Sequence, residues 1–113
     1  MKSSKPFLLA VALIAGCSSE SSLKTALSEM AALVPGGTYH DAICQSQVDM
    51  LRLAVQSRDN GDSVEAFSAV TLSLAQDLGQ ETVRAYGKVF KAVWDSEVAA
   101  GDIGDLYLSV CLD

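Results

Sequence analysis

The chain has 113 residues, half of them hydrophobic, and a formal net charge of −6 at pH 7. This length accommodates one domain, and the apolar content is too high for a disordered chain, so we expect a packed core. The negative charge argues against nucleic acid and anionic lipid headgroups as partners, because both require lysine and arginine to neutralise phosphate.

The first 16 residues have the three zones of a signal peptide. Lys2 and Lys5 give the chain a basic start, and a nine-residue apolar run from Phe7 to Ala15 follows them. This run is too short to cross a bilayer as a helix, which takes roughly 20 residues, but it has the length of a signal-peptide core. The small residues Ala15 and Gly16 then precede Cys17, where they allow an extended backbone to enter a peptidase site.

The segment Leu13-Ile14-Ala15-Gly16-Cys17 resembles the lipobox of bacterial lipoproteins. In that family the cysteine sulfur receives a diacylglyceryl group, a dedicated signal peptidase cuts before the cysteine, and the new amine is usually acylated. The resemblance implies cleavage between Gly16 and Cys17 and a stable lipid anchor on Cys17. Ser18 stands where the enterobacterial inner-membrane retention signal has aspartate, which favours the outer membrane. The alternative is an ordinary secretory leader with a chance cysteine.

A serine-rich stretch separates Cys17 from the first apolar pattern. A short flexible segment spans only about 5–6 Å times the square root of its length, so we expect residues 17–22 to be a tether that keeps the domain close to the membrane. Residues 23–113 should then form one helical domain. The part of the chain after Gly16 has six basic and fourteen acidic residues, a formal charge of −8.

Apolar residues recur with helical spacing in five segments of this domain, and no segment alternates with a period of two for long enough to predict a strand. We therefore expect an all-α fold, a compact bundle of four to five short helices. The first stripe consists of Leu23, Ala26, Leu27, Met30, Ala31 and Val34, and it stops at Pro35-Gly36-Gly37. The second stripe consists of Ile43, Cys44, Val48, Leu51, Ala54 and Val55. We expect Thr38 to cap this second helix and the segment Arg58-Asp59-Asn60-Gly61 to end it as a turn.

Three further stripes follow. The third consists of Val64, Phe67, Val70, Thr71, Leu74 and Leu78, with Asp62 expected as its N-cap and Gly79 at its end. The fourth helix is expected from about Gln80 to Ala100, on Val83, Tyr86, Val89, Phe90, Val93, Trp94 and Val98, with Gly101 ending it. The last helix is expected to start at a capping Asp102 and to carry Ile103, Leu106, Tyr107, Val110 and Cys111.

Cys44 and Cys111 remain as an even pair once Cys17 is acylated, in a compartment that oxidises thiols. Both lie on apolar stripes, so we expect them to face the interior and to form a disulfide bond between the second helix and the end of the chain. In the chain-entropy model, closing so long a loop is worth roughly 4 kcal/mol. The alternatives are two buried free thiols or a redox-active pair, although redox motifs generally place their cysteines close together in sequence.

His40 is the single histidine of the chain, and Asp41 follows it near the start of the second helix. Neighbouring side chains on a helix diverge by about 100°, so we expect a surface histidine and no hydrogen-bonded His–Asp couple of the kind that a catalytic triad needs. Metal sites of useful affinity take three or four ligands, and none is predicted. Nucleophile-elbow, phosphate-loop and zinc-protease motifs are missing, so we expect no enzyme and no cofactor.

Tyr86, Phe90 and Trp94 fall at i, i+4 and i+8 of the fourth predicted helix and form a continuous aromatic ridge. Core packing is the favoured interpretation, with Trp94 at the margin and partly exposed. The alternative is a groove for a partner's helix or an acyl chain.

These features together predict a membrane-anchored periplasmic lipoprotein that acts as a protein-interaction module, as an adaptor, an assembly or pilot factor, or an inhibitor. Its partner would be another envelope protein. Size, lipid and paired cysteines are similar to those of small lipoproteins that pilot secretion components, of some immunity and exclusion lipoproteins, and of small periplasmic acid chaperones; these are analogies without a shared motif. The alternative function is to bind a small apolar ligand or lipid between helices.

Overall fold

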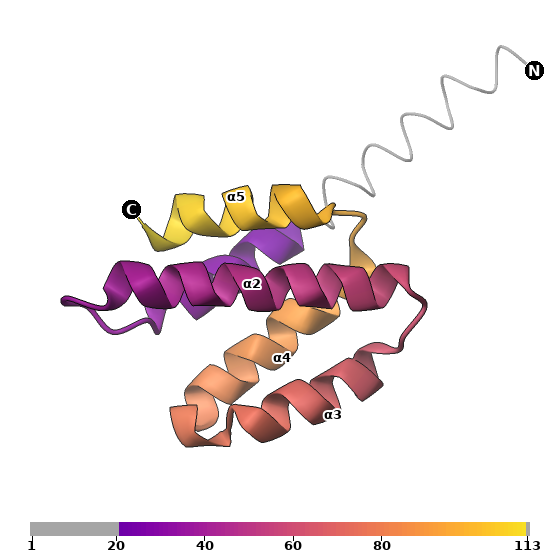
Figure 1. The fold of residues 1–113 in the computed structure, drawn as a ribbon, viewed down its shortest axis with the longest axis horizontal. Helices are drawn as coiled ribbons and strands as arrows, with labels where there is room; N and C mark the ends of the chain where they lie inside the picture. The colour runs from indigo at the N-terminus through magenta and orange to yellow at the C-terminus, as the bar shows by residue number, and fades with distance from the viewer. Residues whose placement is uncertain (1–20, 113) are drawn as a thin grey trace, which may run out of the picture.

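Five α-helices make up almost all of the part of the chain that the structure, a computed structural model, describes, which is residues 21–112 (Figure 1). They are a first helix covering residues 21–32, then α2 (His40–Asp59), α3 (Val64–Leu74), α4 (Gln80–Asp95) and α5 (Ala100–Cys111), with the short 3₁₀ helix η1 (Gln76–Leu78) after α3. Residues 21–112 contain no strand, so the predicted all-α fold is confirmed.

The predicted signal peptide (residues 1–16), the cleavage site after Gly16 and the anchor Cys17 lie outside the described residues. Ser21 and Ser22, which the sequence placed in the tether, are already helical. Within residues 21–112, no helix combines the length and the apolar character that crossing a bilayer would take.

The helices form two connected parts, which Figure 1 shows from one side. The antiparallel helices α2 and α5 lie side by side along most of their length, and the first helix lies behind them. Helices α3 and α4 form a hairpin that extends away from this layer. Gly61 (φ 91°) lies in the turn before α3, and Gly79 (φ 96°) joins η1 to α4. Both have a conformation that favours glycine, and the sequence predicted a helix end at each.

The core is built from the predicted stripes of four of the five helices. Its wholly buried side chains include Leu27 of the first helix, Leu51 of α2, Phe90 of α4, and Ile103 and Tyr107 of α5. None of the residues of α3 reaches the same degree of burial. Val70, Leu74 and Leu78 were predicted to face the core, but they are 66%, 82% and 56% exposed, so this part of the third stripe was predicted wrongly.

The expected caps of α2 and α3 are each displaced by one residue. Tyr39, and not Thr38, is the N-cap of α2, and no side chain caps this end, because the turn that begins at Gly37 satisfies the amide of His40 through the Gly37 carbonyl. Ser63 caps α3, where its hydroxyl accepts a hydrogen bond from the Ala66 amide at 3.1 Å.

The fourth predicted helix is divided into α4 and the start of α5. Helix α4 ends at Asp95, residues 96–99 form a link, and Gly101 lies inside α5, where the sequence placed a helix end. Ala99 is the N-cap of α5, without a side-chain hydrogen bond, and Asp102 lies in its first turn and does not cap it. A carboxylate in this position still favours the helix, since the first turn carries partial positive charge.

Candidate functional site

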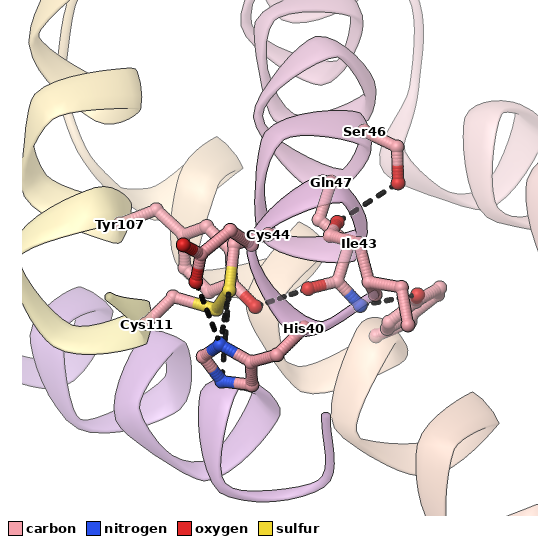
Figure 2. The surroundings of a disulfide bond; sticks show 9 residues. His40, Ile43, Cys44, Ser46, Gln47, Tyr107 and Cys111 are labelled. Atoms are coloured by element: carbon pink, nitrogen blue, oxygen red, sulfur yellow. Dashed lines mark hydrogen bonds and ion pairs between the residues drawn. A yellow bond between two sulfur atoms is a disulfide. The ribbon is translucent and has the colours of Figure 1, made fainter. Parts of the chain in front are cut away.

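Cys44 and Cys111 form a disulfide bond between the beginning of α2 and the last residue of α5 (Figure 2). Their Cα atoms are 6.0 Å apart, and the two positions are separated by 67 residues in sequence. Cys44 is fully buried and Cys111 is 4% exposed. The predicted disulfide is confirmed, and the alternative of two free thiols is contradicted by the structure.

His40 covers one side of this disulfide bond. Each of its ring nitrogens lies 3.9 Å from the Cys44 Sγ atom, so the sulfur faces the ring itself (Figure 2). The Nδ1 atom lies 3.1 Å from Oδ1 of Asp41, a hydrogen bond that the sequence analysis excluded. The expectation was wrong because His40 is the first residue of α2, where no preceding turn restricts its side chain, and Asp41 is exposed and free to turn toward the ring.

Metal-ligand atoms of His40, Cys44 and Cys111 all lie within 4.8 Å of one another. In the oxidised chain the two sulfurs are bonded to each other, so neither is the thiolate that a zinc ion requires. While the disulfide is intact, the two cysteines therefore crosslink α2 to α5 and do not offer thiolate ligands to a metal ion. The sequence did not predict this cluster, because His40 and Cys111 are far apart in sequence and only the folded chain brings them together.

A buried polar chain lies beside the disulfide and connects three helices. The hydroxyl of Tyr107 in α5 donates to the Gln47 Oε1 of α2, and the Gln47 Nε2 donates to the Tyr86 Oη of α4 at 2.8 Å. Burial raises the pKa of the Tyr107 phenol well above its ordinary value, and the nearby Tyr86 adds to this increase. The neutral, hydrogen-bonded form of Tyr107 is therefore the one that the fold maintains.

The aromatic ridge of α4 is covered by other side chains. Tyr86 and Phe90 are buried, and Trp94 is half-buried. Phe67 of α3 packs edge-on against Phe90, with ring centroids 4.9 Å apart, and lies 5.5 Å from Trp94. The Trp94 Nε1 donates to the Asp62 carbonyl at 2.9 Å. The three residues thus join α3 to α4, which is the core packing that the sequence favoured over a groove.

The exposed outer face of α3 offers a different surface. Val70 and Leu74 of α3 and Leu78 of the following η1, here together named the α3 stripe, are more than half exposed. No charged residue occurs from Ala66 to Gln76. A surface helix normally carries charged or polar residues opposite its apolar face, and α3 lacks charge on both faces over this stretch. That absence was the signal in the sequence that α3 differs from an ordinary amphipathic core helix.

A shallow, open depression of about 630 Å³ lies between the first helix and α4. Its walls include Glu29, Lys88, Lys91 and Asp95, and Lys88 Nζ lies 3.6 Å from a carboxylate oxygen of Glu29. Charged walls and an open mouth do not favour the burial of an apolar ligand, because the charges would lose their water.

Two features of the described residues are therefore candidates for a functional site: the disulfide centre, formed by Cys44, Cys111 and His40, and the α3 stripe. The first is a buried crosslink with a histidine at its edge, and the second is an uncovered apolar helix face. A scan against protein-family models, a search of curated proteins and a search of solved structures each gave no match.

Proposed function

We propose that this protein is a bacterial envelope lipoprotein whose helical domain binds another envelope protein through the α3 stripe. The resemblance of Leu13–Cys17 to a lipobox supports an anchor on Cys17 and a position at the periplasmic face of the outer membrane. In that position the domain acts as an adaptor, a pilot factor or an inhibitor. The observation that carries the binding role is the exposed, uncharged outer face of α3.

Leaving such a face in water has a free-energy cost. Apolar surface is worth about 25 cal/mol per Å² when buried, and contiguous exposed apolar patches on soluble proteins commonly mark interaction sites. After Glu65 in its first turn, the exposed positions of α3 are Ala66, Ala69, Val70, Ser73 and Leu74. They follow the i, i+3, i+4, i+7, i+8 spacing along which one helix packs against another. Small side chains beside large ones allow a partner helix to approach closely.

The charges at both ends of α3 indicate what kind of helix fits. Asp62 and Glu65 lie at its start, and Asp77 and Glu81 follow its end, where Arg84 is the nearest basic residue in sequence. A partner helix with an apolar face and basic residues at its ends would pair with these carboxylates. Electrostatic complementarity of this kind gives specificity and speeds association.

Two other occupants fit less well. Two copies of α3 packed face to face would bring acidic ends against acidic ends in either orientation, on mature chains that would each carry a formal charge of −8. Anionic lipid headgroups would meet the same carboxylates, and their surface potential repels negative charge. The partner we propose is therefore a protein helix with an apolar face and basic ends.

Two synthetic peptides test this proposal. Both are amphipathic helices with the same leucine and alanine face, one with lysines at its two ends and the other with glutamates. We expect the lysine peptide to bind the purified domain at least tenfold more tightly than the glutamate peptide, and more weakly as salt is raised. Isothermal titration calorimetry measures both affinities.

Leu74→Ser should weaken binding of the lysine peptide by about five- to tenfold, because roughly 1 kcal/mol of apolar burial is lost. Leu53→Ser is the matched control, since Leu53 is 59% exposed on α2; its affinity should stay within twofold of the parent. Equal affinities for the two peptides, or equal effects of the two substitutions, would refute the proposed partner. Analytical ultracentrifugation tests whether a second copy of the chain occupies the face, and flotation with anionic vesicles tests whether lipid does. Concentration-dependent dimers or vesicle binding that depends on Leu74 would refute the proposed helical partner.

A further inference from the structure

The disulfide centre contains the parts of a second crosslink. We propose that the dithiol form of this chain binds one Zn²⁺ through Cys44, Cys111 and His40, so that a metal ion replaces the disulfide in joining α2 to α5. The three ligand atoms already lie within 4.8 Å of one another. Two thiolates and an imidazole are ligands that zinc prefers, with water completing a tetrahedron. This inference does not depend on the proposed function.

The distances are close to those of a zinc site. With Zn–S near 2.3 Å and Zn–N near 2.0 Å, a tetrahedron places nitrogen about 3.5 Å from sulfur and the two sulfurs about 3.8 Å apart. The Cys44 Sγ is already 3.9 Å from the ring nitrogens of His40. When the S–S bond breaks, the sulfurs separate to their non-bonded distance, which is close to the spacing that zinc requires. The backbone therefore has little to adjust.

Asp41 adds an orienting contact. Its Oδ1 lies 3.1 Å from the His40 Nδ1. In the tautomer that carries its proton on Nδ1, His40 donates to this carboxylate and its Nε2 lone pair is left for a metal. Histidines that bind zinc usually donate their other ring N–H to such a carboxylate or carbonyl, and loss of that partner typically weakens metal binding ten- to hundredfold.

Access and surroundings are compatible with an ion. The sulfurs are buried, while the His40 side chain is 27% exposed and forms the solvent side of the cluster. The buried neighbours shown in Figure 2, Gln47 and Tyr107, are neutral and hydrogen-bonded to each other. The exposed carboxylate of Asp41 contacts the His40 ring, and a carboxylate there favours a cation.

The conversion balances with a small dithiol as reductant. Two electrons from the dithiol break the Cys44–Cys111 bond, the dithiol becomes a disulfide, and its two protons go to the new thiols. Zinc binding then displaces one proton from each thiol into solvent. A bound ion closes the same 67-residue separation as the disulfide, so it constrains the unfolded chain in a comparable way.

Cobalt titration tests the proposal, because a tetrahedral Co²⁺ thiolate site has characteristic visible and near-ultraviolet absorption. The protein is the full chain with Cys17→Ser, reduced by a phosphine that is then removed. We expect one Co²⁺ per chain, displaced by one Zn²⁺, and none for the oxidised protein. Should the reduced chain lose helicity, zinc is expected to restore it.

Two pairs of variants assign the ligands. His40→Ala should weaken zinc binding at least tenfold, and Cys44→Ser should abolish the cobalt spectrum. Asp41→Asn should weaken binding about tenfold, whereas Asp49→Asn, an exposed change on the same helix, should leave it unchanged. The proposal fails if the reduced chain shows no thiolate–cobalt absorption, if zinc does not restore lost helicity, or if His40→Ala binds zinc as tightly as the parent.

Discussion

At the scale of single residues, Arg58 connects the end of α2 to the end of α4 and to the link before α5. Its guanidinium donates to the carbonyls of Val93 (3.1 Å), Ser96 (2.9 Å) and Val98 (2.7 Å). The side chain is 14% exposed, so these are largely desolvated, charge-assisted bonds. A cation at the carboxyl end of a helix also interacts favourably with the helix dipole.

Arg58→Ala should lower the free energy of unfolding by about 2–4 kcal/mol, because three charge-assisted hydrogen bonds are lost and the carbonyls of Ser96 and Val98 lose the guanidinium as donor. Arg58→Lys should recover less than half of this loss, since an ammonium group does not reproduce the planar fork of the guanidinium. Arg84→Ala, an exposed change on α4, should stay within about 0.5 kcal/mol of the parent. Urea unfolding followed by circular dichroism measures all three. A loss below 0.5 kcal/mol for Arg58→Ala would show that these hydrogen bonds do not stabilise the fold.

Tyr107 gives the stability of the domain a dependence on high pH. Its folded pKa is raised above the ordinary value of 10.0, first by burial and then by Tyr86. Above pH 10 the unfolded chain therefore loses this proton while the folded chain keeps it, so the unfolding free energy falls by about 1.4 kcal/mol per pH unit. Below pH 10 this contribution is fully present.

Urea unfolding between pH 8 and pH 11 checks this expectation. Tyr107→Phe should remove one proton's worth of the slope above pH 10, although its stability at pH 8 should be lower because Gln47 loses a buried donor. Tyr39→Phe is the control, since Tyr39 is 75% exposed; its slope should match the parent. An unchanged slope in Tyr107→Phe would mean that this phenol ionises alike in both states.

At the scale of elements, α3 depends on Ser63 for its start. The sequence placed the cap at Asp62, but the Asp62 carboxylate instead accepts a hydrogen bond from the Ser57 hydroxyl at 2.7 Å. Ser63→Ala should cost about 1 kcal/mol of stability, the usual value for loss of an N-cap. Ser73→Ala, at an exposed position in the last turn of the same helix, should be neutral or slightly stabilising, because alanine has the higher helix propensity. Thermal unfolding of both variants tests whether Ser63 is the cap. Equal melting temperatures for Ser63→Ala and Ser73→Ala would count against Ser63.

Helical periodicity was sufficient to predict which residues form the core of the first helix, α2, α4 and α5. It was not sufficient to predict the division between α4 and α5. The segment from Asp95 to Ala99 contains neither glycine nor proline, so no local signal ends a helix there. The helix stops at a position where Arg58, 38 residues away in sequence, binds the Ser96 carbonyl. Such a boundary is set by tertiary contacts, which a local pattern does not contain.

Tertiary contacts also decide which residues of α3 are covered. Spacing identifies the residues that share a helix face, but it does not identify what covers that face. Phe67 finds Phe90 and Trp94 opposite it, whereas Leu74, two turns later, has nothing over most of its surface. The disulfide was predictable because two cysteines allow only one pairing after Cys17 is set aside. The His40–Asp41 contact was not, because it depends on side-chain conformations at the first residues of α2.

At the scale of the molecule, the crosslink and the α3 stripe belong to different parts of the fold. The disulfide joins α2 to α5, while the stripe lies on the hairpin of α3 and α4. The two parts share the core through the buried face of α4, and Arg58 and the chain of hydrogen bonds through Gln47 add polar contacts between them. A rigid, crosslinked base that carries an uncovered helix suits binding, since a preorganised face loses little conformational entropy when a partner docks.

The lipobox resemblance predicts that the whole molecule resides at the outer membrane. Cys17→Ser should move the protein from the membrane fraction to the soluble periplasmic fraction of an enterobacterial host, because no acyl chain is then attached to hold it. Ser18→Asp should keep it membrane-bound but shift it from the outer to the inner membrane, since aspartate at this position is the retention signal of that family. Fractionation and sucrose-gradient separation of the membranes measure both. Metabolic labelling with a fatty acid provides the control, with label expected on the parent and on Ser18→Asp and none on Cys17→Ser. If Cys17→Ser still sediments with the membranes and the parent takes up no label, the protein is not anchored by a lipid on this cysteine.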